Sequence, residues 1–338
     1  MKKLKAVSVI FIVALFLVLA TEGIGLCQQK AYHWRIGFNT VEGSVRDVAA
    51  KEFRRIVSER TNGQVKVDIF PGEILGTEQE MIEAVMVGAL DIQLSGGGSM
   101  QNLIPEFAAS ALPFVVHDFE EAYALLDGSW GDKLKALAEE RNLKILSFCD
   151  LGFAQITNSK RPIYTPDDLK GIKIRSPNEP VSIETFKALG AAVSTLPFSE
   201  VYLALAQKVV DGQFNPLDAI WDSKFYEVQD YLAIINVFYY NVNFMMNKAL
   251  WDSLPGDLQN IVQEAAYAAR DVSREFSQAK HTEMLEKLRP HFKEITYPDS
   301  ALFQQKIAPL YQGVFTNIVP KYAIDSVIKF TEDYRKNK

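Results

Sequence analysis

Apolar residues recur with two different periods in the first third of the chain. Residues 34–38 and 64–70 alternate apolar and polar side chains, and 91–94 (DIQL) is a further short segment of this kind. We expect these three segments to be strands. Between them, 45–57 and 78–87 carry apolar residues at helical spacing. Strands and helices that alternate at such short spacing predict a parallel α/β sheet.

This alternation breaks in the middle of the chain. Two predicted strands, 143–148 and 153–158, follow each other with little room for a helix, which indicates a crossing into a second domain. In that part, 171–177 (GIKIRSP) has the pattern of a short buried strand, whereas 211–216 (DGQFNP) is expected to be a tight polar loop. The long apolar stretch 232–246 is extended and long enough to run back into the first domain.

One helical pattern is unusually long. Residues 255–289 contain no Pro or Gly beyond the first two positions. A single helix of this length would span roughly 50 Å, more than one lobe needs, so we expect it to cross both. The alternative is two helices with an unmarked break. A strand at 292–296 and closing helices within 302–334 complete the prediction.

The N-terminal segment has the layout of a secretory signal. Basic residues at positions 2, 3 and 5 precede an apolar run at 6–20, and small and polar residues follow. We therefore expect 1–27 to be a signal peptide that is removed on export to a bacterial periplasm. An uncleaved membrane anchor is the alternative, although the run is short for a span. A lipid anchor on Cys27 is disfavoured by the bulky Leu26.

Length and composition fit a soluble protein of two domains. The chain has 338 residues, of which 48% are hydrophobic and 23% charged. Removal of 1–27 would leave 33 basic and 41 acidic residues, a net charge of −8. Such a balance, without basic runs, argues against nucleic acid as a partner. Cys149 would be the one remaining cysteine, so no intrachain disulfide is expected.

The sequence contains no pattern typical of a reaction. The four His residues, at positions 33, 117, 281 and 291, are scattered, so we expect no metal site and no cofactor. The run 95–99 (SGGGS) matches neither a dinucleotide fingerprint nor a P-loop, although it can serve as a ligand-facing turn. An enzyme on this scaffold would need an acid, a base or a nucleophile that no motif supplies. We expect no catalytic residue.

What remains are side chains suited to a small-molecule pocket. Arg175 lies at the carboxyl end of a predicted strand, where open α/β sheets place ligands, and its guanidinium can hold a carboxylate by two parallel hydrogen bonds. From spacing alone, an ordinary surface Arg is an equal alternative. Asn39 and Asn215 are adaptable hydrogen-bonding groups, and Phe198 and Trp221 are flat apolar walls or core residues.

Several spaced motifs resemble one known family. They resemble the solute-binding proteins of tripartite ATP-independent periplasmic (TRAP) transporters over essentially the whole mature chain. The family resemblance implies two α/β lobes with a hinge and one long helix that spans both. We expect lobe I to comprise 31–151 plus 241–280 and lobe II 152–240 plus 281–338, with ligand in the cleft between them. The motifs are 157–163 (TNSKRPI), 171–177 (GIKIRSP), 197–205 (PFSEVYLAL), 210–216 (VDGQFNP) and 224–229 (KFYEVQ).

The resemblance also assigns pocket positions. Arg175 falls on the family's carboxylate-binding Arg, and Asn215, Asn39 and Phe198 fall on other pocket positions. Many members carry a second pocket Arg where this chain has Ala154.

Three further positions differ from the polar residues that other members carry. Phe214, Thr77 and Gly96 stand at these pocket positions here. We therefore expect a less charged pocket that takes a monocarboxylate with an apolar or aromatic body. A C4-dicarboxylate or a sugar acid is the alternative.

The expected partners follow from the same resemblance. A monomeric protein would capture an organic acid in the periplasm and deliver it to the membrane subunits of a sodium-driven TRAP permease. A sensory protein that presents the closed form to a receptor is the alternative.

Overall fold

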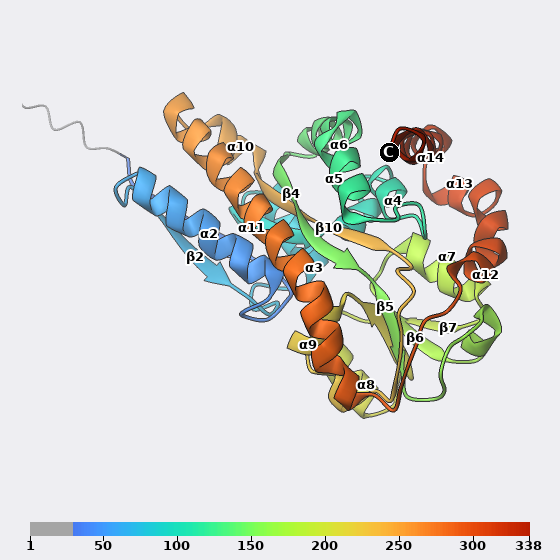
Figure 1. Cartoon of the computed structure of the whole chain (residues 1–338). Coiled ribbons are helices and arrows are strands. Elements are labelled where there is room, and N and C mark those ends of the chain that lie inside the picture. Colours follow the sequence, from blue (N-terminus) through green and yellow to red (C-terminus); the bar gives the residue numbers. More distant parts are fainter. Residues whose placement is uncertain (1–29) are drawn as a thin grey trace, which may run out of the picture. The chain divides into compact units, whose positions relative to one another are not determined.

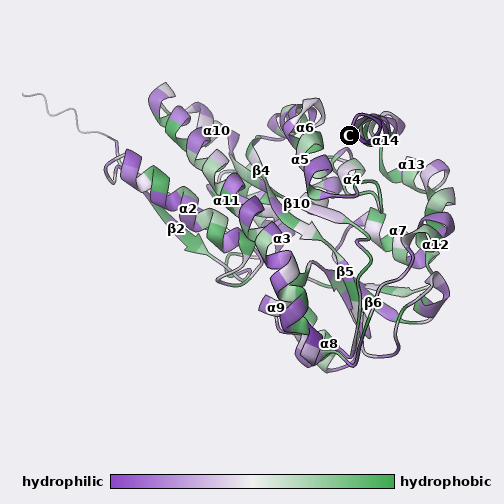
Figure 2. Ribbon diagram, viewed as in Figure 1, coloured by the Kyte–Doolittle hydropathy of each residue, from purple (hydrophilic) through white to green (hydrophobic). Residues whose placement is uncertain are grey.

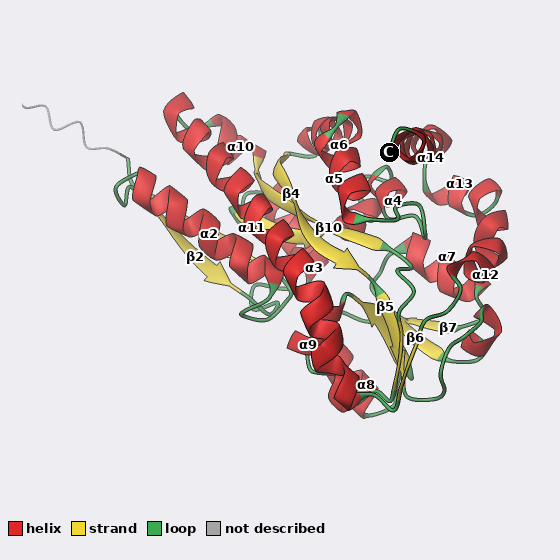
Figure 3. Cartoon of the chain, viewed as in Figure 1, coloured by secondary structure: helices red, strands yellow, loops and turns green. Residues whose placement is uncertain are grey.

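The structure, a computed structural model, describes residues 30–338, and the signal peptide expected at 1–27 lies outside these residues. Helices flank two separate β-sheets, as Figures 1 and 3 show. We call the five-stranded sheet with its helices lobe I and the six-stranded sheet with its helices lobe II. This arrangement confirms the expected α/β fold of two lobes.

Lobe I is built on strands in the order β2-β1-β3-β10-β4. β1 and β3 are parallel, as the alternation in the first third of the chain predicts, but β10 is antiparallel to both of its neighbours, so the sheet as a whole is mixed. The antiparallel strand comes from late in the chain, which returns to lobe I from lobe II. The strands are β1 (Tyr32–Gly37), β2 (Val65–Phe70), β3 (Ile92–Gly96), β4 (Leu143–Phe153) and β10 (Tyr239–Asn247).

Lobe II is built on strands in the order β11-β9-β5-β8-β6-β7. β6 is parallel to β7 and to β8, whereas β5 is antiparallel to β8 and to β9. The segment expected to be a tight loop at 211–216 instead contains the central strand β8. The strands are β5 (Gln155–Asn158), β6 (Lys173–Ser176), β7 (Ala192–Thr195), β8 (Gly212–Asn215), β9 (Tyr231–Ala233) and β11 (Glu294–Thr296).

The long helix α2 of lobe I covers the sheet with one apolar stripe. On α2, Ala49, Phe53 and Val57 are fully buried, and the Phe53 ring lies 4.9 Å from the ring of Phe244 on β10. Burial of such a stripe is the main source of stability for a helix in a protein. The helices are α2 (Val45–Arg60), α3 (Glu78–Met86), α4 (Phe107–Ser110), α5 (Phe119–Asp127), α6 (Ser129–Glu139) and α10 (Lys248–Asp252).

The helices of lobe II are shorter. Phe186 of the helix that follows β6 stacks on Phe214 of β8, with ring centroids 4.6 Å apart, and both rings are buried in the core of this lobe. The helices are α7 (Pro180–Ala188), α8 (Val201–Ala206), α9 (Leu217–Asp222), α12 (Ser300–Ile307) and α13 (Phe315–Ile318).

A single helix, α11 (Gly256–Leu288), contacts both lobes, which excludes the alternative of two helices. Its middle packs on α2 and β4, and its C-terminal part packs on α9. Figure 2 shows hydrophobic and hydrophilic residues on different sides of its turns. Small buried residues such as Ala266 and Ser273 allow close approach, and Ser273 Oγ accepts a hydrogen bond from the backbone N–H of Asp150 at 3.1 Å. The helix α11 therefore packs on both lobes and connects them.

Two connections between strands also cross between the lobes. β4 leads into β5 through Ala154, and β9 leads into β10 through 234–238. The crossings pair with each other, because Ala154 N–H donates to Phe238 O at 2.9 Å and Val237 N–H donates to Ala154 O at 3.1 Å. These two hydrogen bonds lie at the hinge between the lobes.

The C-terminal helix α14 (Lys321–Lys336) packs on α4 and α5 of lobe I. Tyr322 donates to Glu106 at 2.6 Å, and Arg335 Nε lies 2.8 Å from the buried carboxylate of Glu121. This placement corrects the expectation that all of 281–338 belongs to lobe II. With the strand ends as the structure has them, we propose that 31–153, 239–280 and 321–336 form lobe I and that 154–238 and 281–320 form lobe II.

No helix among residues 30–338 is long and apolar enough to cross a membrane.

The packing of α2 on the sheet generates a stability prediction. Phe53→Ala should lower the free energy of unfolding by about 3–5 kcal/mol, because it removes a ring that is 0% exposed and leaves a cavity against Phe244. Val87→Ala, at a side chain that is 79% exposed in the same lobe, should change it by less than about 0.5 kcal/mol. Urea unfolding measures both, and equal effects would contradict the packing described.

Candidate functional site

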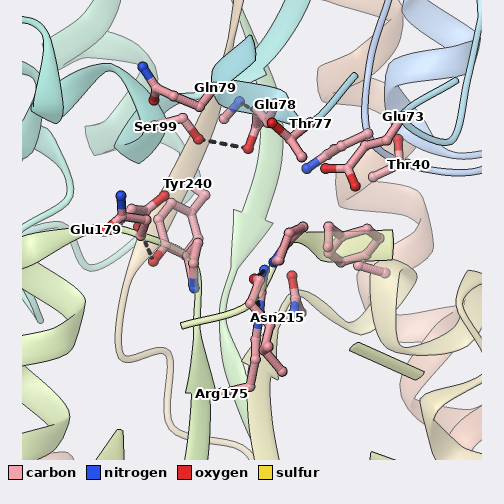
Figure 4. A pocket seen from close by; sticks show the side chains of 18 of the residues that line it. Thr40, Glu73, Thr77, Glu78, Gln79, Ser99, Arg175, Glu179, Asn215 and Tyr240 are labelled. Carbon is pink, nitrogen blue, oxygen red and sulfur yellow. Dashed lines mark hydrogen bonds between the residues drawn. The ribbon is translucent and has the colours of Figure 1, made fainter. Parts of the chain in front are cut away.

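A cavity of about 380 Å³ lies between the two lobes. Figure 4 shows its polar side chains in opposed groups: one wall carries residues of lobe I, the facing wall carries Arg175 and Asn215 of lobe II, and Glu179 and Tyr240 lie to one side. The lobe I wall includes Asn39, Thr40, Glu73, Thr77, Glu78, Gln79 and Ser99.

Arg175 is positioned by the carboxyl end of β6 and is 3% exposed. Its Nε and Nη2 both donate to the carbonyl of Leu196, at 3.0 and 2.7 Å. A guanidinium has five N–H donors, so the edge formed by Nη1 and the second hydrogen of Nη2 stays available for a carboxylate. Burial lowers the pKa of Arg175 to about 10, and the group therefore remains charged at neutral pH.

Three other sequence-predicted residues accompany Arg175 on the lobe II wall. Asn215, at the end of β8, donates from its amide to Gln213, which fixes the orientation of the side chain. The ring of Phe198 lies 6.0 Å from the Arg175 guanidinium, within the range of a cation–π contact. Phe214 reaches the lining but is mostly a core residue, since only 2% of it is exposed.

Lobe I supplies three more of the predicted residues. Asn39 follows β1 and is buried in the lining. Thr77 lines the cavity, yet its hydroxyl forms a capping box with Glu80 at the start of α3. Gly96 ends β3, and a Cβ there would lie 3.1 Å from Nη2 of Arg46. Gly96 therefore leaves space for a neighbouring arginine.

Two predicted site residues do not belong to this cavity. Trp221 lies on α9, where it stacks on Tyr226 with ring centroids 5.0 Å apart and packs against His291. It lines a separate, smaller cavity near α11. Ala154 is fully buried at the hinge, where its backbone pairs the crossing strands. The structure therefore brings neither residue into the lining of the cavity that contains Arg175.

The structure adds an arginine that the sequence analysis missed. Arg46, on α2, lines the cavity and is 2% exposed. Its Nη2 lies 3.2 Å from Oε1 of Glu78, and the Glu78 carboxylate also accepts from Gly96 N–H and from the Ser99 hydroxyl, each at 2.7 Å. The pair is therefore held in a fixed position on the lobe I wall.

A second missed group is the carboxyl of Glu179, in the loop between β6 and α7. Its Oε2 accepts from the hydroxyls of Tyr240 and Ser182, both at 3.1 Å. Burial, followed by the negative charge of Glu78, raises the pKa of Glu179 to about 7, while both hydroxyls and Arg175 oppose the rise.

These additions change the expected character of the site. The lining carries two arginines, Arg46 and Arg175, and three carboxyl groups, Glu73, Glu78 and Glu179. The lining is therefore more charged than expected, because Arg46 on α2 and Glu179 after β6 lie outside the motif positions on which that expectation rests. The sequence does contain a signal for Arg46, because this charged residue falls on the apolar, buried stripe of α2. Glu179 could have been found because it follows β6, a strand that ends in the site.

Among residues 30–338, no cluster of three or more His, Cys, Asp or Glu side chains is arranged to hold a metal ion. With hydrogen-bonding groups on both walls and an arginine on each, the geometry is that of a binding site for a polar anion between two lobes.

The fold and this site define a two-lobed solute-binding protein. Residues 37–317 match the family described as bacterial extracellular solute-binding protein, family 7. The chain belongs to this family, the solute-binding proteins of TRAP transporters, which bind solutes and are not enzymes.

Relatives of known or named ligand support the assignment. The 2,3-diketo-L-gulonate-binding periplasmic protein YiaO of Escherichia coli is 32% identical over 322 residues, 95% of this chain and 97% of YiaO. The sugar acid binding protein DctPAm of Advenella mimigardefordensis, solved with galactonate, superposes with a TM-score of 0.87 at 31% identity, covering 90% of this chain and 99% of DctPAm. A TRAP solute-binding protein of Sulfurospirillum deleyianum, solved with succinate, gives 0.83 at 30% identity, covering 89% and 98%.

The pair formed by Arg46 and Glu78 generates a prediction independent of any ligand. Arg46→Met should lower the free energy of unfolding by about 3–5 kcal/mol, because the Glu78 carboxylate would stay buried without its cation. Arg55→Met is the matched control on the same helix, since its ion pairs are exposed, and should leave the urea midpoint nearly unchanged. A similar loss in both variants would mean that the buried pair has no special weight.

Proposed function

We propose that this protein captures a monocarboxylate with a hydroxylated body, a sugar acid, in the cavity between its lobes. Arg175 binds the carboxylate, and the lobe I wall hydrogen-bonds the hydroxyl groups. The sequence alone favoured an apolar or aromatic body, and we replace that part of the expectation while keeping the single carboxylate.

The observation that carries the proposal is the polarity of the wall that faces Arg175. Glu78 and Glu73 offer carboxylate acceptors, Arg46 offers donors, and Asn39 and Gln79 offer both. A hydroxyl group can donate and accept at once, so a chain of hydroxyls matches this mixture. An apolar or aromatic body would desolvate the same groups without replacing their hydrogen bonds, at a cost of about 1–3 kcal/mol for each group.

The charges of the lining support one carboxylate instead of two. Its two arginines are outnumbered by three carboxyl groups, and Arg46 already pairs with Glu78. A second ligand carboxylate would therefore lie in a closed, poorly hydrated site without a cation of its own, which is unfavourable. This argument favours a sugar acid over a C4-dicarboxylate.

Capture requires both lobes, and the described contacts suit closure around the ligand. Ser199 N–H of lobe II donates to Glu73 of lobe I at 3.1 Å, and Val181 N–H donates to Gln101 of lobe I, also at 3.1 Å. A ligand that contacts both walls favours the closed form by its differential affinity for that form. We propose that the closed protein delivers its ligand in the periplasm to a TRAP permease, as its family membership implies.

A panel of organic acids tests the ligand class. Galactonate and erythronate should raise the melting temperature by several degrees, since a ligand at 100 times its Kd adds about 2.7 kcal/mol. Succinate and benzoate should bind at least about tenfold more weakly in calorimetry. If succinate bound more tightly than galactonate, a ligand with two carboxylates would be favoured. If benzoate bound more tightly than galactonate, a ligand with an apolar or aromatic body would be favoured.

The role of Arg175 is tested by replacing it. Arg175→Ala should weaken galactonate binding by at least about 100-fold, because a desolvated carboxylate without its cation costs about 3–5 kcal/mol. Arg175→Lys should recover part of the affinity at most, because an ammonium lacks the planar fork. Arg289→Ala, at an exposed arginine of lobe II, should leave Kd unchanged. Calorimetry measures all three, and unchanged affinity in Arg175→Ala would remove this residue from the site.

A further inference from the structure

The carboxyl of Glu179 is a cavity group that carboxylate binding by Arg175 does not explain. It is 5% exposed and lies on lobe II between β6 and α7. A Cβ on Gly98 of lobe I would lie 2.5 Å from this carboxyl group, so the Gly98 backbone covers it. In the closed protein, Glu179 is thus enclosed by both lobes.

Charged and titratable groups face Glu179 from several elements. Arg175 on β6 is a cation of the same lobe as Glu179. Glu78 on α3 is an anion of the opposite wall, where it is paired with Arg46. Tyr240 on β10 donates a hydrogen bond to the Glu179 carboxyl group. The attraction of Arg175 helps to keep Glu179 ionised. A ligand carboxylate placed on Arg175 would compensate that positive charge and add a negative one beside Glu179.

We propose, on the basis of the proposed function, that Glu179 takes up a proton from solvent when an organic acid binds, and that its neutral carboxyl then donates a hydrogen bond within the closed site. An O–H bond forms at the Glu179 carboxylate as the buffer acid loses its proton, and no other bond changes. Protonation of Glu179 removes one negative charge from the site, so that Arg175 alone can neutralise the carboxylate of the ligand.

The direction of the pH dependence follows by linkage. Because binding favours the protonated form, affinity falls as pH rises through the range in which Glu179 is ionised in the empty protein and protonated in the complex. One proton sets the limit of the slope at a tenfold loss of affinity per pH unit. Burial raises the pKa of Glu179 to about 7, so we expect the fall in affinity above neutral pH and little change below pH 6.

Calorimetry of galactonate binding tests the proposal. At pH 7.5, titrations in buffers of different ionisation enthalpy should reveal the uptake of a substantial fraction of one proton by the wild-type protein. Glu179→Gln should abolish this uptake and make Kd nearly independent of pH from 6 to 8.5. Asp218→Asn is the matched control, because Asp218 is also buried with a pKa of about 7 but does not line the cavity. It should retain the uptake.

The outcomes separate this inference from the proposed function. Binding of galactonate without proton uptake, or uptake that persists in Glu179→Gln, would overturn the inference alone. If succinate or benzoate binds instead of galactonate, the same titrations are made with that acid. Absence of binding by every acid of the panel would overturn both proposals. If Glu179→Gln fails to fold, carboxyl ¹³C NMR of the wild-type protein decides, since a Glu179 signal that titrates near pH 4.5 with and without ligand would contradict proton uptake.

Discussion

The buried guanidinium of Arg175 is the constraint on which the site depends. A cation that is 3% exposed loses most of its hydration, and the carbonyl of Leu196 restores two hydrogen bonds along one edge. Because these two bonds fix the plane of the guanidinium, the edge formed by Nη1 and Nη2 keeps a defined direction before any ligand arrives. This preorganisation reduces the entropy that binding must overcome.

The long helix and the crossing strands hold Arg175 of lobe II opposite side chains of lobe I that are distant in the sequence. α11 packs on α2 and β4 of lobe I and on α9 of lobe II, while the crossing strands pair at Ala154. Arg46 lies on α2 and Glu78 on α3, so both belong to the lobe I wall that faces Arg175.

Much of this architecture could be predicted from the sequence, because periodicity reports which faces of strands and helices are buried. The long helix, the strand ends that carry Arg175 and Asn39, and the pocket position of Asn215 followed from local patterns and family motifs. Strand direction could not be predicted in the same way, since the pairing of β10 with β3 depends on contacts far apart in the chain. The segment 211–216 (DGQFNP) predicts a loop instead of the strand β8, because it is rich in turn-forming residues.

Side-chain partners were harder to predict than backbone positions. The buried pair of Arg46 and Glu78 joins two helices, and a pattern within one helix cannot name the partner on another. Ala154 stands where many family members carry a second pocket arginine, and this difference predicts a site with one arginine. In this chain the second cavity arginine, Arg46, comes from α2 instead. The consequence is chemical, because an arginine already neutralised by Glu78 offers hydrogen bonds without free charge. Such a group can recognise hydroxyls. In our proposal the anion is bound by Arg175, and Glu179 is the carboxyl that competes for this cation.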